Sequence, residues 1–413
     1  MQTLAELDLT YLPMEEPGFS DNPWPHFAAA RKQHPWLAQC AFGYVIHDYV
    51  AMKDLLIQDD RMRLAIGMII QIMGAAGTPW ARMLEGGIAC QTGEDHKRLR
   101  RILQPLFTPK QAKLNRDRMR EVMSRLLDQW APRGAFDFEE FASNFPIGVV
   151  CSMIGAPLEE IPRLRSSLET LGLQFSMDLE MLPALQEATM ILDDFAQQVV
   201  AERRAGKRPE KGGELLDALL DAVGGGGMSE RELYDLLIFL FAAGYDTSKN
   251  MMTWIMHDML DRPDCYQRFA EDLAFSEKIV EESFRYHSVA NIPRTTTADI
   301  VYRDVLVPAG TMLFFPVSVS GRDPSAFPDP DTYDPERTHV NRHLGFGRGA
   351  HVCLGQFIAR AQIAEGLHLI AQRIKSPTLA APVTWRPFYG VWGIKGLPIE
   401  FEPAPRAWTC TSG

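Results

Sequence analysis

Residues 343–355 read HLGFGRGAHVCLG, a segment in which four glycines accompany a single cysteine, Cys353. The residues that follow have helical periodicity, so Cys353 directly precedes an amphipathic helix whose free N-terminal amides favour an anion. Glycine allows the backbone to approach a bulky planar group closely. The segment therefore indicates a thiolate ligand to iron, although a small, buried and inert cysteine is the common alternative.

Two other functions of a glycine-rich loop are less favoured by the sequence. The segment lacks the final G-K-[ST] of a phosphate-binding P-loop and the G-x-G-x-x-G spacing of dinucleotide folds. A zinc site is also disfavoured, because no second cysteine lies at ligand spacing.

The composition predicts a folded globular protein. The 413 residues are 46% hydrophobic and 23% charged, and a formal net charge of −11 argues against nucleic-acid binding. The N-terminus, MQTLAELDLTYLPMEEPGF, lacks a basic region followed by an apolar run, so we expect no signal peptide and no membrane anchor. Six widely spaced cysteines predict a reducing, cytoplasmic location.

The pattern of the chain predicts one domain over residues 1–413, mainly helical in its first three quarters. A capping box at Ser229 and Glu232 begins a helix that continues to Pro263 and is apolar nearly all round in part of its length, as expected of a central buried helix. Residues 294–319 are rich in β-forming residues around a Pro-Ala-Gly turn, and residues 388–401 predict a further turn or hairpin.

The spacing around Cys353 resembles the haem-binding loop of the cytochrome P-450 monooxygenases. The matching residues are Phe346, Gly347, Gly349, His351, Cys353 and Gly355. The resemblance implies that Cys353 is the proximal iron ligand, with Phe346 near the sulfur and His351 close to a propionate of haem b. An axial thiolate donates electron density to iron and favours O–O cleavage.

This resemblance extends over about residues 20–402 and implies the P-450 fold, a helix-rich domain with a smaller β-rich region. In the long helix, Gly244, Asp246 and Thr247 resemble the acid–alcohol motif of the family. The family then implies that Gly244 leaves room for dioxygen and substrate, while Asp246 and Thr247 organise water for proton delivery. The alternative is a helix kink, with Thr247 bonded back to a carbonyl and Asp246 in an ion pair.

Two further groups of residues match the family in the expected order. Glu282 and Arg285, at i,i+3, resemble its buried Glu-x-x-Arg pair, which Arg337 would complete, although Thr338 replaces the usual aromatic residue. A surface pair between Glu281 and Arg285 is the alternative.

His96 and Arg100, at i,i+4, resemble the propionate-binding pair, and Arg294 matches another propionate contact. Haem carboxylates must be neutralised when buried, and arginine suits that task. A solvated helix face is the usual alternative for this spacing.

The resemblance implies a monooxygenase that receives electrons from NAD(P)H through ferredoxin reductase and ferredoxin, and we expect a monomer. A basic surface would attract an acidic ferredoxin; its members are Lys97, Arg98, Arg101, Arg348 and Arg360. A peroxide-dependent peroxygenase, a haem-thiolate isomerase and a haem sensor without turnover are the alternatives.

The expected substrate is a hydrophobic small molecule such as a terpenoid, a steroid or an aromatic hydrocarbon. The residues expected to line its pocket are Ile238, Ala242, Ala243, Val289, Ile292 and Trp392. Arg61, Arg63 or Arg82 would instead anchor a substrate carboxylate.

Overall fold

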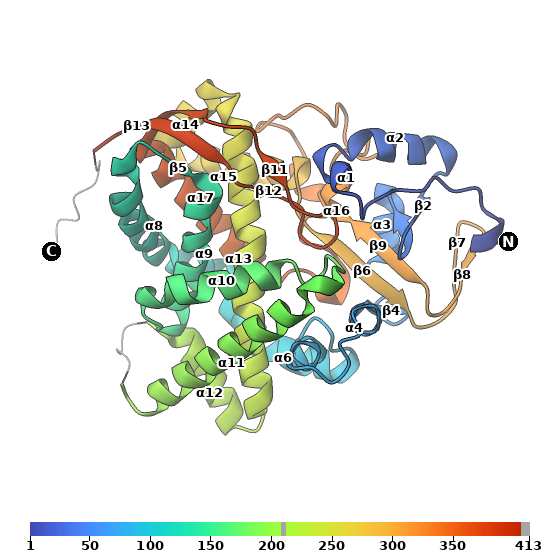
Figure 1. Ribbon diagram of the computed structural model, residues 1–413, viewed down its shortest axis with the longest axis horizontal. Coiled ribbons are helices and arrows are strands. Elements are labelled where there is room, and N and C mark those ends of the chain that lie inside the picture. The colour runs from blue at the N-terminus through green and yellow to red at the C-terminus, as the bar shows by residue number, and fades with distance from the viewer. Residues whose placement is uncertain (208–211, 406–413) are drawn as a thin grey trace.

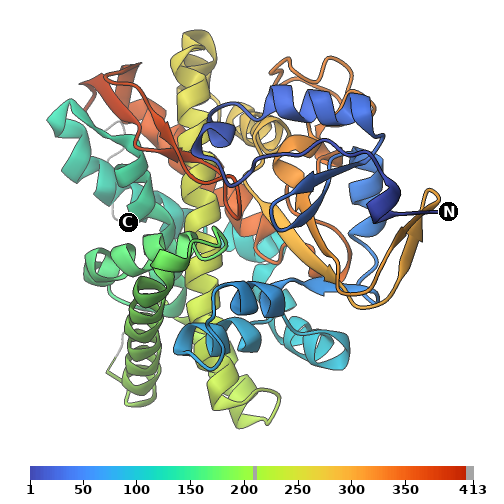
Figure 2. The same ribbon diagram turned by 45° about the vertical axis from the view of Figure 1, so that its right-hand side comes forward.

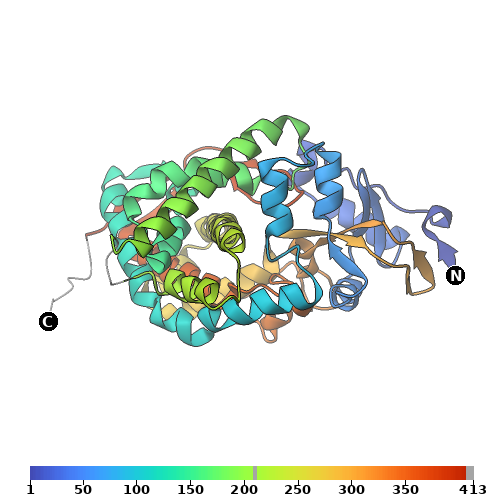
Figure 3. The same ribbon diagram turned by 90° about the horizontal axis from the view of Figure 1, so that it is seen from below.

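A long helix, α13 (Glu230–Leu260), runs through the centre of the molecule. The computed structural model describes residues 1–207 and 212–405. The predicted capping box is formed, because the Ser229 hydroxyl accepts from the Glu232 amide at 3.2 Å and the Glu232 carboxylate accepts from the Ser229 amide at 2.8 Å. Viewed end-on, α13 is surrounded by other helices (Figure 3), which confirms the predicted central position.

Helices form the larger part of the fold. The first nine lie before residue 155, and those that precede α8 are short. They are α1 (Pro17–Asp21), α2 (Trp24–Gln33), α3 (Tyr49–Leu55), α4 (Ile66–Ile72), α5 (Pro79–Gly86), α6 (Gly93–Leu103), α7 (Pro109–Leu114), α8 (Arg116–Trp130) and α9 (Phe138–Ile154). The later ones are α10 (Ile161–Gly172), α11 (Leu182–Arg204), α12 (Glu214–Gly224), α14 (Pro263–Glu271), α15 (Leu273–Tyr286), α16 (Val317–Ser320) and α17 (Gln356–Arg373). Among the described residues, no helix combines the length and apolarity needed to cross a bilayer.

The strands gather mainly on one side of the molecule (Figures 1 and 2). The largest sheet has the order β2-β3-β9-β6-β4. Its strands are β2 (Leu37–Cys40), β3 (Gly43–Ile46), β4 (Met62–Leu64), β6 (Asn291–Thr296) and β9 (Met312–Pro316). The predicted β-rich segment after residue 292 is confirmed, but the expectation of a helical N-terminal region was incomplete, since β2, β3 and β4 come from it.

Smaller sheets complete the β region. They have the orders β1-β8-β7, β10-β13-β5 and β11-β12. Their strands are β1 (Gln2–Thr3), β5 (Ala135–Asp137), β7 (Ile300–Tyr302), β8 (Val305–Val307), β10 (Ile374–Leu379), β11 (Thr384–Trp385), β12 (Ile394–Lys395) and β13 (Pro398–Pro403). The β11–β12 pair confirms the hairpin expected in residues 388–401 in part, because β11 begins before that range.

Helix α17 packs closely against α8 and α9 at Gly366. A Cβ atom at Gly366 would lie 2.7 Å from Phe145 Cε1 on α9 and 3.1 Å from Met123 Cε on α8. Packed interiors do not yield easily to extra volume, and the Phe145 ring cannot bend away as a methionine terminus can. The absence of a side chain at Gly366 is therefore what permits this crossing.

We expect Gly366→Ala to lower the free energy of unfolding by about 1–3 kcal/mol, because overpacking outweighs the better helix propensity of alanine. Gly67→Ala in α4 is the matched control, since no described atom lies within 4 Å of a Cβ there. Urea unfolding curves would compare the two variants. Equal or greater stability of Gly366→Ala would contradict the proposed crowding.

Candidate functional site

The cysteine loop is held by backbone contacts and two left-handed glycines. The Cys353 amide donates to the Phe346 carbonyl at 2.8 Å, and Gly347 and Gly349 have φ of 67° and 76°. A Cβ atom at Gly349 would lie 2.7 Å from Asp59 Oδ2, so glycine is also needed there for close packing. Cys353 itself lies three residues before Gln356, the first residue of α17, close to the helix start that the sequence predicts.

A cavity of about 270 Å³ connects the cysteine loop with the central helix. Cys353, Gly347, His351 and Gly355 line it from the loop, and Ala243, Gly244 and Thr247 line it from α13. Its remaining walls are largely apolar and include Leu64, Ile88, Phe239, Leu240 and Ile292. At Gly355, a Cβ atom would meet no described atom within 4 Å.

Cys353 lines this cavity, and its side chain is exposed there. Burial raises its pKa, while the Gly355 amide and the nearby Arg100 and Arg360 guanidinium groups oppose that shift. A bound metal cation deprotonates a coordinating thiol outright, which makes ligation the chemistry that suits this sulfur.

Four basic side chains gather along one part of the cavity wall: His96, Arg100, Arg294 and His351. The rings of His96 and His351 lie 4.2 Å apart between centroids, and burial together with the nearby Arg294 charge lowers the pKa of His351 to about 4. Arg294 Nη1 lies 3.4 Å from Asp59 Oδ1.

The polar atoms of this basic cluster are incompletely satisfied. Arg294 Nε is buried without a hydrogen-bond partner among the described residues. Buried donors of this kind require an acceptor, and the carboxylates of haem would supply it. The apolar walls, the cysteine and this basic cluster together fit haem. The cluster contains the four residues that the family resemblance assigned to the haem carboxylates.

The two side chains of the acid–alcohol motif lie in different surroundings, because Thr247 lines the cavity and Asp246 does not. Thr247 lines the cavity, and its hydroxyl donates to the Ala243 carbonyl at 2.8 Å. Asp246 does not line the cavity; its carboxylate accepts from Arg386 Nη1 and from Asn250 Nδ2 at 3.1 Å. Both features of the alternative interpretation are thus present, and Arg386 is a residue that the sequence analysis missed.

Glu282 and Arg285 form the buried pair that the family resemblance implies. Arg285 donates to the two carboxylate oxygens of Glu282 at 2.8 and 2.6 Å, and Arg337 Nε lies 3.6 Å from Glu282 Oε1. Arg285 also donates to the carbonyls of Gly321 and Thr332 at 2.8 and 2.9 Å. The guanidinium group thereby ties α15 to the proline-rich segment that precedes the cysteine loop.

The neighbouring acid, Glu281, is not the partner of Arg285. It accepts from Arg360 at 2.7 and 3.0 Å and lies 3.1 Å from His343 Nε2. Burial by itself raises the pKa of Glu281, but the hydrogen bonds from His343 and Arg360 lower it to about 2. Arg360 in turn lies 4.1 Å over the Phe346 ring, so the second acid of α15 also supports the loop.

Two of the predicted substrate residues line the cavity. Ala243 and Ile292 line the cavity, whereas Ile238, Ala242, Val289 and Trp392 do not. The sequence of a helix that is apolar nearly all round does not reveal which face meets a cavity. In α13, Phe239 and Leu240 line the cavity in place of the predicted Ile238 and Ala242.

Trp392 and the three predicted anchoring arginines also lie elsewhere. Trp392 packs in an aromatic cluster with Trp254 and Trp385, and its Nε1 donates to the Ser20 carbonyl at 3.0 Å. Val289 is buried, and its carbonyl accepts from the Trp392 amide. Arg61, Arg63 and Arg82 are exposed, and none of them lines the cavity.

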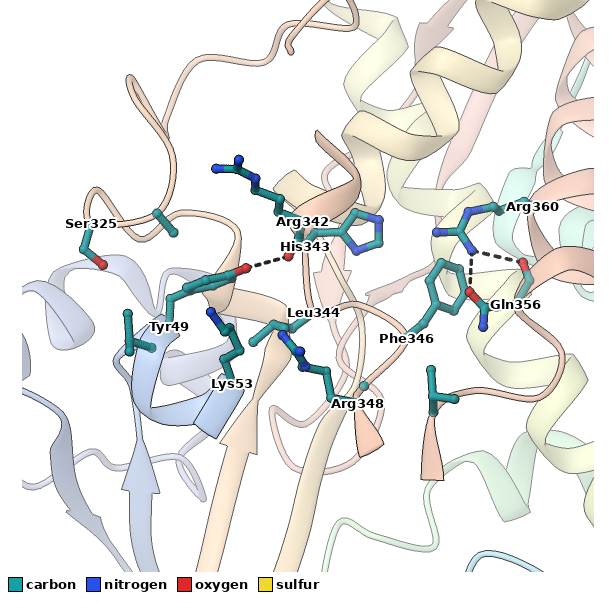
Figure 4. Close-up of a pocket in the computed structure, with 14 residues that line it drawn as sticks. Tyr49, Lys53, Ser325, Arg342, His343, Leu344, Phe346, Arg348, Gln356 and Arg360 are labelled. Atoms are coloured by element: carbon teal, nitrogen blue, oxygen red, sulfur yellow. Dashed lines mark hydrogen bonds between the residues drawn. The ribbon is translucent and has the colours of Figure 1, made fainter. Parts of the chain in front are cut away.

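A second depression, of about 540 Å³, lies beside the same cysteine loop (Figure 4). The cations that line it are Lys53, Arg342, Arg348 and Arg360. Its described lining residues include no carboxylate.

The remaining residues of the predicted basic surface differ from this group. Lys97 pairs with Glu94 at 2.7 Å, and Arg98 pairs with Glu232 at 2.5 Å. Lys97, Arg98 and the exposed Arg101 do not line the second depression.

Comparisons with known proteins agree with this geometry. The family model described as Cytochrome P450 matches residues 164–377. Luteothin monooxygenase of Streptomyces thioluteus is 30% identical over 404 residues, 96% of this chain and 97% of that protein. Mycinamicin IV hydroxylase/epoxidase of Micromonospora griseorubida is 31% identical over 309 residues, 73% of this chain and 76% of that protein. The crystal structure of CalO2 superposes with a TM-score of 0.85 at 22% identity, covering 96% of this chain and 100% of that one.

We expect Glu282→Gln to lower the free energy of unfolding by about 3–5 kcal/mol, because it leaves the buried Arg285 guanidinium group without a counter-charge. Glu277→Gln is the control on the same helix: its carboxylate pairs with Arg116 but is 50% exposed, so the loss should stay below about 1 kcal/mol. Chemical unfolding would measure both losses. Similar values for the two variants would show that the buried pair is not a principal support.

Proposed function

Because this chain belongs to the cytochrome P450 family, and is an oxidoreductase of the monooxygenase type, we propose that it inserts one oxygen atom from O₂ into a hydrophobic small molecule. One observation carries the proposal: the same apolar cavity is lined by Cys353 and by Gly244 and Thr247 of α13. The reaction would take place in one catalytic domain. We also propose a cytoplasmic, monomeric enzyme, since widely spaced cysteines suit a reducing compartment.

Each side of the cavity would contribute differently to binding haem. Cys353 would ligate the iron, while His96, Arg100, Arg294 and His351 would neutralise the two carboxylates. When bound, thiolate-ligated haem supplies the O₂ chemistry of the reaction. Gly347 and Gly355 would keep side chains away from the space beside the cysteine, and Phe346 would hold the Cys353 amide through its carbonyl, at 2.8 Å.

The distal side would bind and orient the substrate. Ile88, Phe239, Leu240, Ala243 and Ile292 offer apolar contacts, which favour burial of a hydrocarbon skeleton and exclude water. Thr247 is the hydroxyl placed to hold a proton-carrying water, since its own hydrogen is directed to the Ala243 carbonyl and its oxygen can accept. We therefore propose a terpenoid, steroid or aromatic substrate. The relatives named luteothin monooxygenase and mycinamicin IV hydroxylase/epoxidase support oxidation of a particular organic compound.

Electrons would come from NAD(P)H through ferredoxin reductase and ferredoxin. The second depression supports this proposal, because its four cations lie beside the cysteine loop and would attract an acidic partner. Lys53 and Arg342 now join Arg348 and Arg360 in the proposed surface. Lys97 and Arg98 do not line this depression. Because Arg360 already pairs with Glu281, most of the attraction would come from Lys53, Arg342 and Arg348.

A peroxide-dependent reaction is a second candidate, because Asp246 does not line the cavity and a proton relay matters most when O₂ is the oxidant. Turnover with NAD(P)H, ferredoxin reductase and ferredoxin would be compared with turnover driven by hydrogen peroxide. Product from the first system supports the monooxygenase. Product with peroxide but none with the NAD(P)H system would favour a peroxygenase. A ligand-induced spectral change without product in either system would indicate a haem sensor.

We expect the reduced, CO-bound protein to have a Soret band far to the red of that of a histidine-ligated haem, and Cys353→Ser to lose that band because serine removes the thiolate. Cys265→Ser is the control, since Cys265 lies outside the cavity lining. Absorption spectra at equal haem content would make the comparison. An unchanged band in Cys353→Ser would refute the assignment of the ligand.

We expect Lys53→Glu together with Arg342→Glu to raise the Kd for an acidic ferredoxin by tenfold or more, roughly, at low salt. The difference should shrink at high salt as charges are screened. Lys395→Glu on β12 is the control, because this exposed lysine does not line the second depression. Titration calorimetry would measure the affinities, and equal Kd values for the double variant and wild type would exclude this surface as the docking site.

A further inference from the structure

Helices α13 and α17 form two adjoining walls of the cavity that contains Cys353. The lining residues of α13 are Phe239, Leu240, Ala243, Gly244, Thr247 and Ser248, and those of α17 are Ile358, Ala359 and Gln362. Each set follows one face of its helix, because its members recur at a spacing of about four residues. Ser248 and Gln362 are the last members of the two sets in chain order.

A hydrogen bond joins these two residues at the corner where the walls meet. Gln362 Nε2 donates to Ser248 Oγ at 2.6 Å, and both residues are buried. One turn farther along each helix, a Cβ atom at Gly366 would lie 3.3 Å from Met252 Cε. Neither Gly366 nor Met252 lines the cavity, so beyond this corner the two helices pack directly against each other.

The surroundings of this bond offer no good replacement for either partner. The part of the cavity wall that comes from α9 consists of Val149, Val150 and Met153, whose side chains have no hydrogen to donate and no strong acceptor. A buried amide that loses its partner is not compensated for its lost hydration. The bond between Gln362 and Ser248 therefore resists separation of α17 from α13 at the corner.

Both helices lead from this corner to the functional residues. On α13, Ser248 follows Thr247 and lies one turn after Gly244, and all three line the cavity. On α17, Gln362 lies within two turns of the start of the helix at Gln356, which closely follows Cys353. A change in the angle between the helices at the corner would therefore alter the space between Cys353 and the lining face of α13.

We propose that Gln362 is a positioning residue: through Ser248 it fixes the angle between α17 and α13, and it thereby limits the size of the ligand that fits between Cys353 and α13. This inference rests on the proposed haem-thiolate function. A bulky ligand has to push α13 away from the cysteine side of the cavity, whereas a small one does not. The bond therefore discriminates against bulky ligands, which a bond that only stabilised the fold would not do.

Spectral titration of the haem-containing ferric protein tests this inference, with imidazole as the small ligand and 4-phenylimidazole as the bulky one. Gln362→Met keeps the length of the side chain but removes the hydrogen bond. We expect the ratio of the Kd for 4-phenylimidazole to the Kd for imidazole to fall severalfold, because α13 then yields to the bulkier ligand. Both ligands bind through an imidazole nitrogen, so the ratio cancels changes in the iron itself.

Two further substitutions of α17 serve as comparisons. Gln362→Glu should keep a ratio near that of wild type, because burial favours a protonated carboxyl group, which can still donate to Ser248 Oγ. Gln372→Met is the matched control near the end of α17: the Gln372 amide donates to the Ala270 carbonyl at 3.1 Å and does not line the cavity. Its ratio should equal that of wild type.

The partner residue provides an independent variant. Ser248→Ala should lower the ratio as Gln362→Met does, and the double variant should lower it no further, because both substitutions break the same bond. Ser248→Ala also carries the test if Gln362→Met does not accumulate as a folded protein.

Urea unfolding of the same variants separates a positioning role from a structural one. If Gln362→Met and Ser248→Ala lower the unfolding midpoint but keep the wild-type ratio of Kd values, the bond only holds the helices together and the inference fails. Additive changes of the ratio in the double variant would also overturn it. If wild type itself binds no haem, or lacks the red-shifted Soret band with CO, the proposed function fails and the inference falls with it.

Discussion

The buried ion pair between Glu282 and Arg285 is the interaction on which the geometry of the cysteine loop depends. One guanidinium group satisfies a carboxylate on its own helix and carbonyl groups in the segment after α16. A charge this deeply buried is stable only if all its partners stay in place, so the pair fixes that segment to α15. The loop that carries Cys353 begins shortly after the same segment, so fixing the segment also restricts where the loop can lie.

The two adjacent acids of α15 have separate structural tasks. Consecutive residues on a helix point in different directions. Glu282 accordingly meets Arg285, while Glu281 meets Arg360 of α17 and His343 at the start of the loop. One helix thus holds the chain before the cysteine and the helix after it. Stacking of Arg360 over Phe346 connects this support with the residue whose carbonyl binds the Cys353 amide.

Much of the loop and its supports could be predicted, because the relevant residues lie close together in sequence. The Cys353 loop, the i,i+3 pair of Glu282 and Arg285, and the i,i+4 pair of His96 and Arg100 are short motifs that carry the family resemblance. Their spacing alone left a surface ion pair and a solvated helix face open. The capping box at Ser229 similarly located the start of α13. The short strands β2, β3 and β4 were missed, because three or four residues give too little alternation to reveal a strand whose partner lies far along the chain.

The distal side could not be predicted in the same way, because its contacts join distant parts of the chain. Arg386 is 140 residues from Asp246, and no spacing rule relates the two. Periodicity also failed to select Phe239 and Leu240 over Ile238 and Ala242, since α13 is apolar around much of its circumference. Even so, an acid within an apolar helix implies a cation nearby, because its burial would otherwise be too costly. The sequence could therefore require a partner for Asp246, and only the fold could identify it.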